Sequence, residues 1–486
     1  MASPFPLHLM LISFSLFSIF TLLINPSIGS SLAEKHRIKL QNLSFKDGSR
    51  PICSPQRPRK EKGELLLELK HHGRCSKPTL NWHEEMQKLL FSDTSRVQTL
   101  QALVRTETLE TGSLSETRIT LVSGIKLNSL NYIVTIGIGN EEKVVLVDTG
   151  SDLTWVQCKP CKSCYEQQDA IFDPSLSPTY NPISCNSSEC LDYENTLGNF
   201  HSCPLNQTTC AYLVTYGDGS YTRGSLGHEK LSLGVDQDDW FKGFVFGCGL
   251  DNHGLFGKAS GLIGLGRSPI SLISQTTSKF GGVFSYCLPS PISSDSSGWL
   301  SFGQGAIGTA NSSEATAYTS LLSKPGISTF YFCNLTGISI GGVLIEVNYS
   351  SNGQVGSLID SGTVISRLFP SVYKAVKAEF LKQTFGLPSA PKFSILDTCF
   401  NLSGYEEVSV PTLRFHFEGG AEINVDESGI LYVAERDNSQ VCLALASLGS
   451  EEEYMILGNF QQQNVRVVYD TKGDRLGFAS QVCSEM

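Results

Sequence analysis

Two short motifs place an aspartate at a tight turn directly after an apolar run. Asp148 begins the sequence Asp-Thr-Gly-Ser, and Asp360 begins Asp-Ser-Gly-Thr. One such motif is a weak indication, because Asp and Gly are common turn residues, but two matching copies are hard to ascribe to turns alone. Two carboxylates brought into contact share one proton over a wide range of acid pH. The ionised member could deprotonate a water while the protonated member donates to a carbonyl, which would be acid–base hydrolysis without a covalent intermediate.

The surroundings of the two motifs also repeat. An apolar segment with glycines, 261–266, follows the first motif, and a similar segment, 455–459, follows the second. Residues 289–298 are rich in Pro, Ser and Gly and read as a linker between the halves. We therefore predict two similar lobes, residues 119–288 and 299–486, each contributing one aspartate to a shared site. The first would carry a Cys-rich insert at 158–210.

Short β-type runs separated by glycines dominate from residue 119 onward. Residues 132–136, 144–147, 244–246 and 262–265 are examples. Their spacing predicts a mostly β protein. Helices are few: an amphipathic face predicts one over 82–104, and Pro370 at a first turn with Gly386 as a stop predicts another over 370–385.

The charge is unevenly distributed along the 486 residues. Residues 1–120 contain 16 Lys or Arg and 11 Asp or Glu, for a net charge of +5, whereas residues 121–486 contain 21 and 36, for −15. An acidic body is repelled by phosphate backbones, so we expect no nucleic-acid partner. The basic front, residues 30–118, is interpreted as a propeptide that lies over the body at neutral pH and leaves as acid protonates the body's carboxylates.

The first residues predict passage through the secretory pathway. Residues 5–24 are almost wholly apolar, and a breaker with small residues follows at 25–31. This pattern favours a signal peptide, residues 1–29, over a signal anchor, although no Lys or Arg precedes the apolar run. We expect a secreted, extracellular monomer without a stable membrane anchor, with the vacuole or plastid as alternatives.

Secretion determines how the cysteines are interpreted. Of 15 cysteines, Cys53 and Cys75 lie in the front, which leaves 13 in the body. In an oxidising compartment Cys158-x-x-Cys161-x-x-Cys164 favours disulfides over a zinc site, and the odd number predicts one free thiol. No metal or other cofactor is expected. Candidate N-glycosylation sequons begin at Asn42, Asn186, Asn206, Asn311, Asn334, Asn348 and Asn401.

These motifs together resemble the pepsin-type aspartic endopeptidases. The matching segments are 147–156, 214–220, 358–363 and 456–458, and the cysteine spacing of 157–210 is similar to that of the nepenthesin-type enzymes of plants. The resemblance covers residues 120–486. It implies a bilobal β fold and hydrolysis of internal peptide bonds in protein or peptide substrates by a proton-sharing aspartate dyad.

The resemblance assigns a role to each matching position. Asp148 and Asp360 match the catalytic pair, Tyr216 and Gly217 belong to a hairpin flap over the substrate, and Trp155 matches an indole that hydrogen-bonds the flap tyrosine. The residues that support the active-site loops would be Thr149, Gly150, Ser151, Ser361, Gly362 and Thr363. Thr149 and Ser361 would cross-link the two loops.

The resemblance also suggests four disulfide pairs. They are Cys185–Cys210, Cys190–Cys203, Cys287–Cys483 and Cys399–Cys442, with Cys333 as the free thiol. The partners among Cys158, Cys161, Cys164 and Cys248 stay open. A second function is also open, because plant proteins with this cysteine pattern include non-catalytic inhibitors of glycosidases.

Overall fold

The fold is taken from a computed structural model of the chain. The structure describes residues 33–40, 58–61, 64–71, 81–109, 132–197, 203, 207–216, 219–234, 240–254, 256–290, 297–307, 316–324, 327–349, 356–481 and 483. By its contacts the chain forms two units, Met1–Ala33 and Glu34–Met486. The predicted signal peptide lies outside the described residues.

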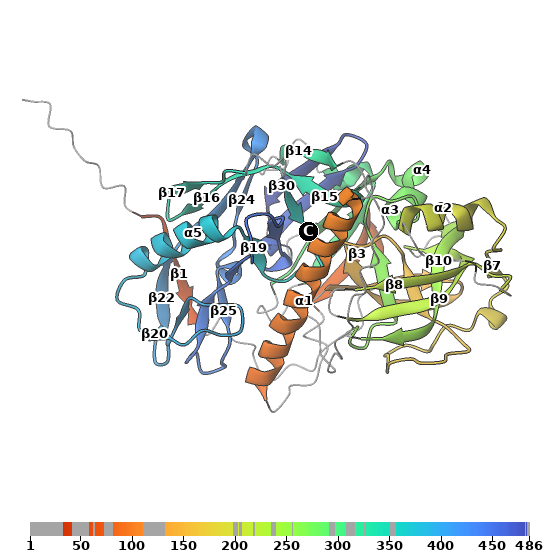
Figure 1. Cartoon of the computed structure of the whole chain (residues 1–486), viewed down its shortest axis with the longest axis horizontal. Coiled ribbons are helices and arrows are strands. Elements are labelled where there is room, and N and C mark those ends of the chain that lie inside the picture. The colour runs from red at the N-terminus through yellow and green to blue at the C-terminus, as the bar shows by residue number, and fades with distance from the viewer. Residues whose placement is uncertain are drawn as a thin grey trace, which may run out of the picture. The chain divides into compact units, whose positions relative to one another are not determined.

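Strands dominate the described chain, as the sequence predicts (Figure 1). The strands before residue 290 are β1 (Lys35–Lys39), β2 (Arg59–Glu61), β3 (Glu64–His71), β4 (Tyr132–Ile138), β5 (Glu141–Asp148), β6 (Trp155–Gln157), β7 (Asn181–Pro182), β8 (Ala211–Thr215), β9 (Tyr221–Ser232), β10 (Trp240–His253), β11 (Gly261–Gly264) and β12 (Val283–Cys287). Those after it are β13 (Gly298–Phe302), β14 (Ala317–Lys324), β15 (Ile327–Cys333), β16 (Leu335–Ile340), β17 (Val343–Glu346), β18 (Ser357–Ile359), β19 (Ser366–Leu368), β20 (Ser389–Ala390), β21 (Cys399–Phe400), β22 (Glu407–Pro411), β23 (Leu413–Phe417), β24 (Glu422–Asn424), β25 (Leu431–Val433), β26 (Val441–Leu443), β27 (Leu445–Ser447), β28 (Ile456–Leu457), β29 (Val465–Asp470) and β30 (Arg475–Ser480). The helices are α1 (Trp82–Leu109), α2 (Ser188–Leu197), α3 (Leu272–Gln275), α4 (Thr277–Phe280) and α5 (Pro370–Gln383).

The same strand arrangement occurs once in each lobe. In the first lobe β5 pairs in parallel with β11, and β6 pairs with β11 and β10. In the second lobe β18 pairs in parallel with β28, and β19 pairs with β28 and β27. Each aspartate therefore lies at the end of a buried strand, and the loop that begins there leads to the next strand of the same sheet. The repeat read from the sequence is a structural repeat.

A sheet common to both halves includes a strand from the basic front. Its consecutive neighbours are β14, β30, β29, β12, β13 and β3, and β3 also pairs with β4 and β2. Leu65, Leu66, Leu67 and Leu69 of β3 are all buried. The front therefore contributes one buried strand to the folded core, in addition to the predicted helix.

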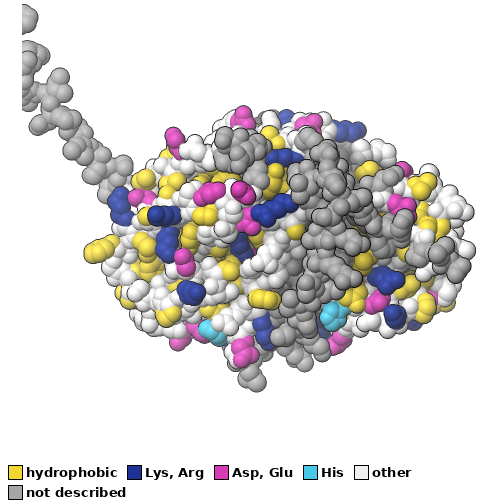
Figure 2. Space-filling view, viewed as in Figure 1, with side chains coloured by type: hydrophobic (Ala, Val, Ile, Leu, Met, Phe, Trp, Pro, Cys, Tyr) yellow, Lys and Arg dark blue, Asp and Glu magenta, His cyan; other side chains and the backbone are white. Residues whose placement is uncertain are grey.

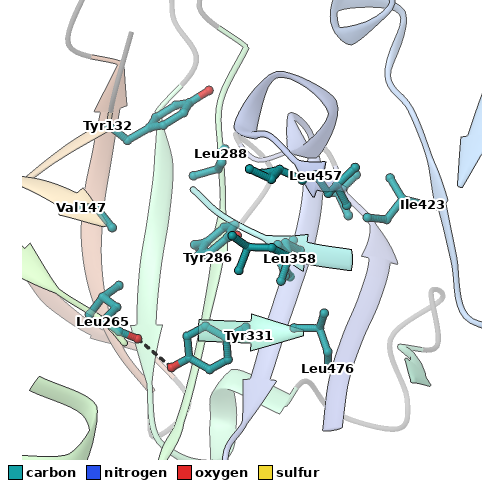
Figure 3. Packing of buried hydrophobic residues seen from close by; sticks show 14 of the residues in the cluster. Tyr132, Val147, Leu265, Tyr286, Leu288, Tyr331, Leu358, Ile423, Leu457 and Leu476 are labelled. Atoms are coloured by element: carbon teal, nitrogen blue, oxygen red, sulfur yellow. Dashed lines mark hydrogen bonds between the residues drawn. The ribbon is translucent and has the colours of Figure 1, made fainter. Parts of the chain in front are cut away.

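Buried strand residues of both lobes meet beneath the two active-site loops. Figure 3 shows Val147 and Leu265 from the first lobe and Leu358 and Leu457 from the second, with Tyr331 between them. The hydroxyl of Tyr331 donates a 2.7 Å hydrogen bond to the carbonyl oxygen of Leu265. Because packed interiors resist displacement, this core holds the two loops in a fixed relation.

Both helices predicted from sequence periodicity are present. In α1 the expected apolar face is buried, through Met86, Leu89, Leu90, Val97, Leu100 and Val104. The helix α5 begins at Pro370 as expected and ends at Gln383, two residues before the predicted end. In Figure 1 α1 lies in front of the strands, with β8 and β9 on one side and β25 on the other.

Six disulfides connect described cysteines, and two of the expected pairs are wrong. Cys287–Cys483 and Cys399–Cys442 form as expected, and the open set resolves into Cys158–Cys248 and Cys161–Cys164. In the insert the pairs are Cys185–Cys203 and Cys190–Cys210 rather than the nested alternative. Cys190 and Cys210 are both buried in one apolar cluster, so packing brings these two together. Cys333 is free and buried, as predicted.

The Cys287–Cys483 disulfide closes a sequence separation of 196 residues. We expect the double variant Cys287→Ser/Cys483→Ser to lose about 4–5 kcal/mol of unfolding free energy, because a long cross-link strongly restricts the unfolded chain. Chemical denaturation measures this loss. Cys333→Ala is the control, and it should cost far less because it breaks no cross-link. Equal losses in the two variants would contradict the prediction.

Acidic and basic side chains are interspersed on the face shown in Figure 2. The sequon residues Asn186, Asn348 and Asn401 are exposed and Asn334 is half-buried, whereas Asn42, Asn206 and Asn311 lie outside the described residues. In the described part of the chain, no helix is long and apolar enough to cross a membrane.

Candidate active site

Asp148 stands at the end of β5 and is held by its own loop. Its side chain is 3% exposed. The Gly150 N–H donates to Oδ1 at 3.0 Å, and the Ser151 hydroxyl donates to Oδ2 at 2.7 Å. Each carboxylate oxygen therefore has one donor from the loop, which fixes its orientation.

Asp360 has the same set of partners in the second lobe. The Gly362 N–H donates to Oδ1 at 3.0 Å, and the Thr363 hydroxyl donates to Oδ2 at 2.6 Å. The side chain is fully buried. The two loops approach each other closely. A Cβ atom at position 362 would lie only 2.5 Å from Oδ1 of Asp148, so a glycine is required there.

The residues after the two aspartates join the loops to each other. The backbone N–H of Thr149 donates to the Ser361 hydroxyl at 3.1 Å, and the backbone N–H of Ser361 donates to the Thr149 hydroxyl at 2.9 Å. These four groups are buried, and a serine serves as well as a threonine because only the hydroxyl takes part.

A residue outside the expected site, Arg96 of α1, lies between the two carboxylates. Its Nη2 atom is 2.6 Å from Oδ1 of Asp148 and 3.0 Å from Oδ1 of Asp360, and its Nε atom donates to Oδ2 of Asp360 at 3.0 Å. The guanidinium side chain is 15% exposed. One cation thus pairs with both carboxylates, and all three side chains are largely shielded from solvent.

Arg96 changes the titration of the site. Burial by itself would raise the pKa of Asp360, but the charge and hydrogen bonds of Arg96, with the donors from Thr363 and Gly362, outweigh burial and lower that pKa below its ordinary value. Burial would lower the pKa of Arg96, but the two carboxylates raise it above its ordinary value. While α1 is docked, Arg96 therefore favours the ionised form of Asp360.

Sequence reasoning missed Arg96 and its neighbour Asp93, one helical turn earlier. Asp93 is buried, and Arg367 of β19 donates to its Oδ2 atom at 2.7 Å. The available signal was a charged residue within the apolar face of the helix, since position 93 continues the spacing of Leu90 and Val97.

The predicted flap is the β8–β9 hairpin, with Tyr216 directly after β8. The Trp155 indole N–H donates to the Tyr216 hydroxyl at 2.8 Å. Phe256 packs edge-on against both rings. Burial raises the pKa of Tyr216 well above its ordinary value, so its hydroxyl stays protonated at acid and neutral pH. Gly217 lies outside the described residues.

We expect Trp155→Phe to lower kcat/KM about tenfold, because it removes the indole N–H that orients Tyr216 and leaves that hydroxyl unpaired in a buried place. Steady-state kinetics on a peptide substrate measure the change. Tyr318→Phe is the control, since Tyr318 lies in β14, where its ring packs against Arg475, and loss of its hydroxyl should leave kcat/KM unchanged. A Trp155→Phe enzyme with the parental kcat/KM would contradict the role assigned to this hydrogen bond.

Comparison with solved structures shows the fold. Basic 7S globulin from soybean is 23% identical, with a TM-score of 0.57 over 73% of this chain and 95% of that one. Conglutin gamma from lupine seeds is 21% identical, with a TM-score of 0.55 over 72% of this chain and 92% of that one. These likenesses concern the architecture alone, and they agree with the predicted bilobal β fold.

Comparison of sequences shows the family. The family models described as xylanase inhibitor N-terminal and C-terminal match residues 132–304 and 330–480. An aspartyl protease family protein of Arabidopsis thaliana is 39% identical over 463 residues, which are 93% of this chain and 94% of that protein. Aspartic proteinase nepenthesin-1 of Nepenthes gracilis is 36% identical over 366 residues, 72% of this chain and 78% of that protein. With paired aspartate loops on a bilobal fold, the chain belongs to the pepsin-type aspartic protease family, in its nepenthesin-like plant branch.

Proposed function

We propose that this protein is an aspartic endopeptidase that hydrolyses internal peptide bonds at acid pH with Asp148 and Asp360. The observation that carries the proposal is the matched set of loop donors on both carboxylates. On each aspartate a hydroxyl and a glycine N–H hold the two oxygens, so both carboxylates present their remaining lone pairs to the space that Arg96 fills.

The chemistry follows from the pair once Arg96 is gone. Two adjacent carboxylates retain one proton in acid. The ionised aspartate removes a proton from a bound water, whose oxygen attacks the carbonyl carbon, while the protonated aspartate donates to the carbonyl oxygen. The resulting diol collapses with proton transfer to the leaving nitrogen. Tyr216 and Trp155 cover the site and limit the entry of further water.

We further propose that the described form is the latent one. Arg96 occupies the place that a water and the scissile carbonyl need, and the buried face of α1 fills the adjoining part of the site. Gln101 adds two buried hydrogen bonds, because its amide donates to the Tyr454 carbonyl oxygen at 2.7 Å and accepts from the Tyr454 N–H at 2.8 Å. Latency thus comes from specific contacts of one helix.

Activation then requires α1 to leave, whereas the buried leucines of β3 belong to the shared sheet. A deletion of residues 30–118 would remove both elements. A substitution on α1 is therefore the cleaner way to separate latency from folding. Two further points are proposed from the sequence alone. They are the propeptide boundary near residue 118 and secretion to the extracellular space.

Two assays distinguish the enzyme from a binding protein. We expect the acid-treated protein to cleave a denatured protein substrate at pH 3–5. In parallel it is tested as an inhibitor of a xylanase, since the matching family models carry that description. Cleavage without inhibition supports the proposal, and inhibition without cleavage supports the alternative. The intact donor sets on both aspartates favour cleavage.

A further inference from the structure

A second charged contact of α1 with the body differs from the dyad contact, because here the body supplies the cation. Arg367 donates from Nη2 to Oδ2 of Asp93 at 2.7 Å. The backbone N–H of Val364 donates to Oδ1 of the same carboxylate at 2.6 Å, and that of Ile365 donates to Oδ2 at 3.2 Å. Three donors of the body, the Arg367 guanidinium and two backbone N–H groups, therefore form an anion site that the Asp93 carboxylate occupies.

This anion site is buried and fixed by the second lobe. The side chains of Asp93 and Arg367 are 1% and 3% exposed. The Arg367 Nη1 atom donates to the Ile365 carbonyl oxygen at 2.7 Å. The Phe460 N–H donates to the Val364 carbonyl oxygen at 3.0 Å, and Arg367 itself lies in β19 between β27 and β28. The three donors are thus held in place by the body and do not depend on α1 for their positions.

Departure of α1 leaves this site without its carboxylate. Among the described residues, Asp93 is the only acidic side chain in an ion pair with Arg367. Release leaves the Arg367 guanidinium and the two backbone N–H groups converging on one point without an acceptor, so the opened site attracts another anion of the same shape. The substrate occupies the space that α1 vacates, and its side chains are the nearest source of a carboxylate.

We propose that Arg367, with the Val364 and Ile365 N–H groups, is a specificity site that accepts an aspartate or glutamate side chain of the peptide substrate. The inference rests on the proposed function and deepens it. Asp93 and Arg96 are three residues apart on a helix, about 4.5 Å along its axis, and one extended residue spans about 3.3 Å. The favoured acidic residue therefore lies one or two positions from the cleaved bond.

Peptide substrates that differ only in Asp or Asn at one position test the proposal. They are assayed with acid-activated enzyme at about pH 5, where an ordinary Asp is ionised. We expect kcat/KM to be at least tenfold higher for Asp at one position near the cleaved bond, since charge-assisted hydrogen bonds are the stronger class. Arg367→Gln should abolish that preference while cleaving the Asn peptide, and Arg367→Lys should retain part of it. Arg267→Gln is the matched control, because Arg267 pairs with Asp474 elsewhere, and it should keep the full preference.

A binding measurement separates failure of this inference from failure of the proposed function. In the full-length chain with Asp93→Asn and Arg96→Gln, both contacts of α1 are weakened, and calorimetry compares the same Asp and Asn peptides. Tighter binding of the Asp peptide that is lost on Arg367→Gln supports the site even if no peptide is cleaved. Cleavage without any Asp preference, or equal binding of both peptides, overturns it. Thermal unfolding of each variant verifies that it is folded.

Discussion

Asp148→Asn is expected to reduce kcat on a peptide substrate by at least about a thousandfold, with KM changed far less. An amide cannot take a proton from water at this position, and general acid–base catalysis contributes roughly 10²–10⁴ on its own. The substitution is nearly isosteric and preserves the acceptor for the Ser151 hydroxyl, so the fold should be retained. Asp360→Asn should have an effect of similar size, because the two loops have equivalent donor sets.

Asp251→Asn is the matched control for the dyad variants. Asp251 lies in β10, where it contacts Lys162 and Tyr221, and its change should leave kcat unaltered. Variants are compared after the same acid treatment, and the extent of processing is followed by mass spectrometry. Cleavage at the parental rate by purified Asp148→Asn protein would refute the dyad, and equal losses in the control would show a folding defect.

Arg96→Gln is expected to remove latency. Removing one partner of a buried charge pair costs about 3–5 kcal/mol, which corresponds to roughly a hundred- to several-thousandfold change in the docked-to-released ratio of α1. The full-length variant should therefore cleave substrate without a lag, whereas the parent should show a lag that acid shortens. Progress curves at several pH values measure both.

The pH dependence has a definite sign. Arg96 lowers the pKa of Asp360 when α1 is docked. The protein with α1 docked therefore binds fewer protons than the protein with α1 released. The stabilisation by docking is fully present above the pKa at which the released pair takes up its shared proton, and it is lost as pH falls through the lowered pKa of the docked state. The parent should activate only in strong acid, and Arg96→Gln should shift the onset of activation to higher pH.

Arg105→Gln is the control for this experiment, because Arg105 is exposed on the same helix and carries the same charge. If latency depended on the total charge of the front, both variants would weaken it equally. Equal shortening of the lag, or an unchanged lag in Arg96→Gln, would contradict a specific contact at the dyad. If only Arg96→Gln shortens the lag, latency is explained by the contact of Arg96 with the dyad. Attraction between the basic front and the acidic body would then not be the cause.

Local patterns were sufficient to predict the elements that hold the site. The apolar run before each Asp-[Thr/Ser]-Gly motif forms a buried strand. A strand that is apolar on both faces is stable only when both faces are removed from water. The face of α1 that the periodicity indicated is the buried face. These inferences depend on residues close together in the sequence, where geometry is fixed by strand and helix repeats.

Distant contacts were not accessible to the same reasoning. The pairing of Cys190 with Cys210 follows from shared burial, which spacing does not reveal. Leu65 to Leu69 was not predicted to be a strand, and its partner β13 lies far along the chain.

The sequence by itself determined that two equivalent aspartate loops exist and that an amphipathic helix precedes them. Only the tertiary structure decided that Arg96 of this helix enters between the two carboxylates and that Asp93 meets Arg367. The physical reason is that a helical repeat specifies which residues share a face, whereas the partner of that face is selected by burial and charge complementarity across hundreds of residues.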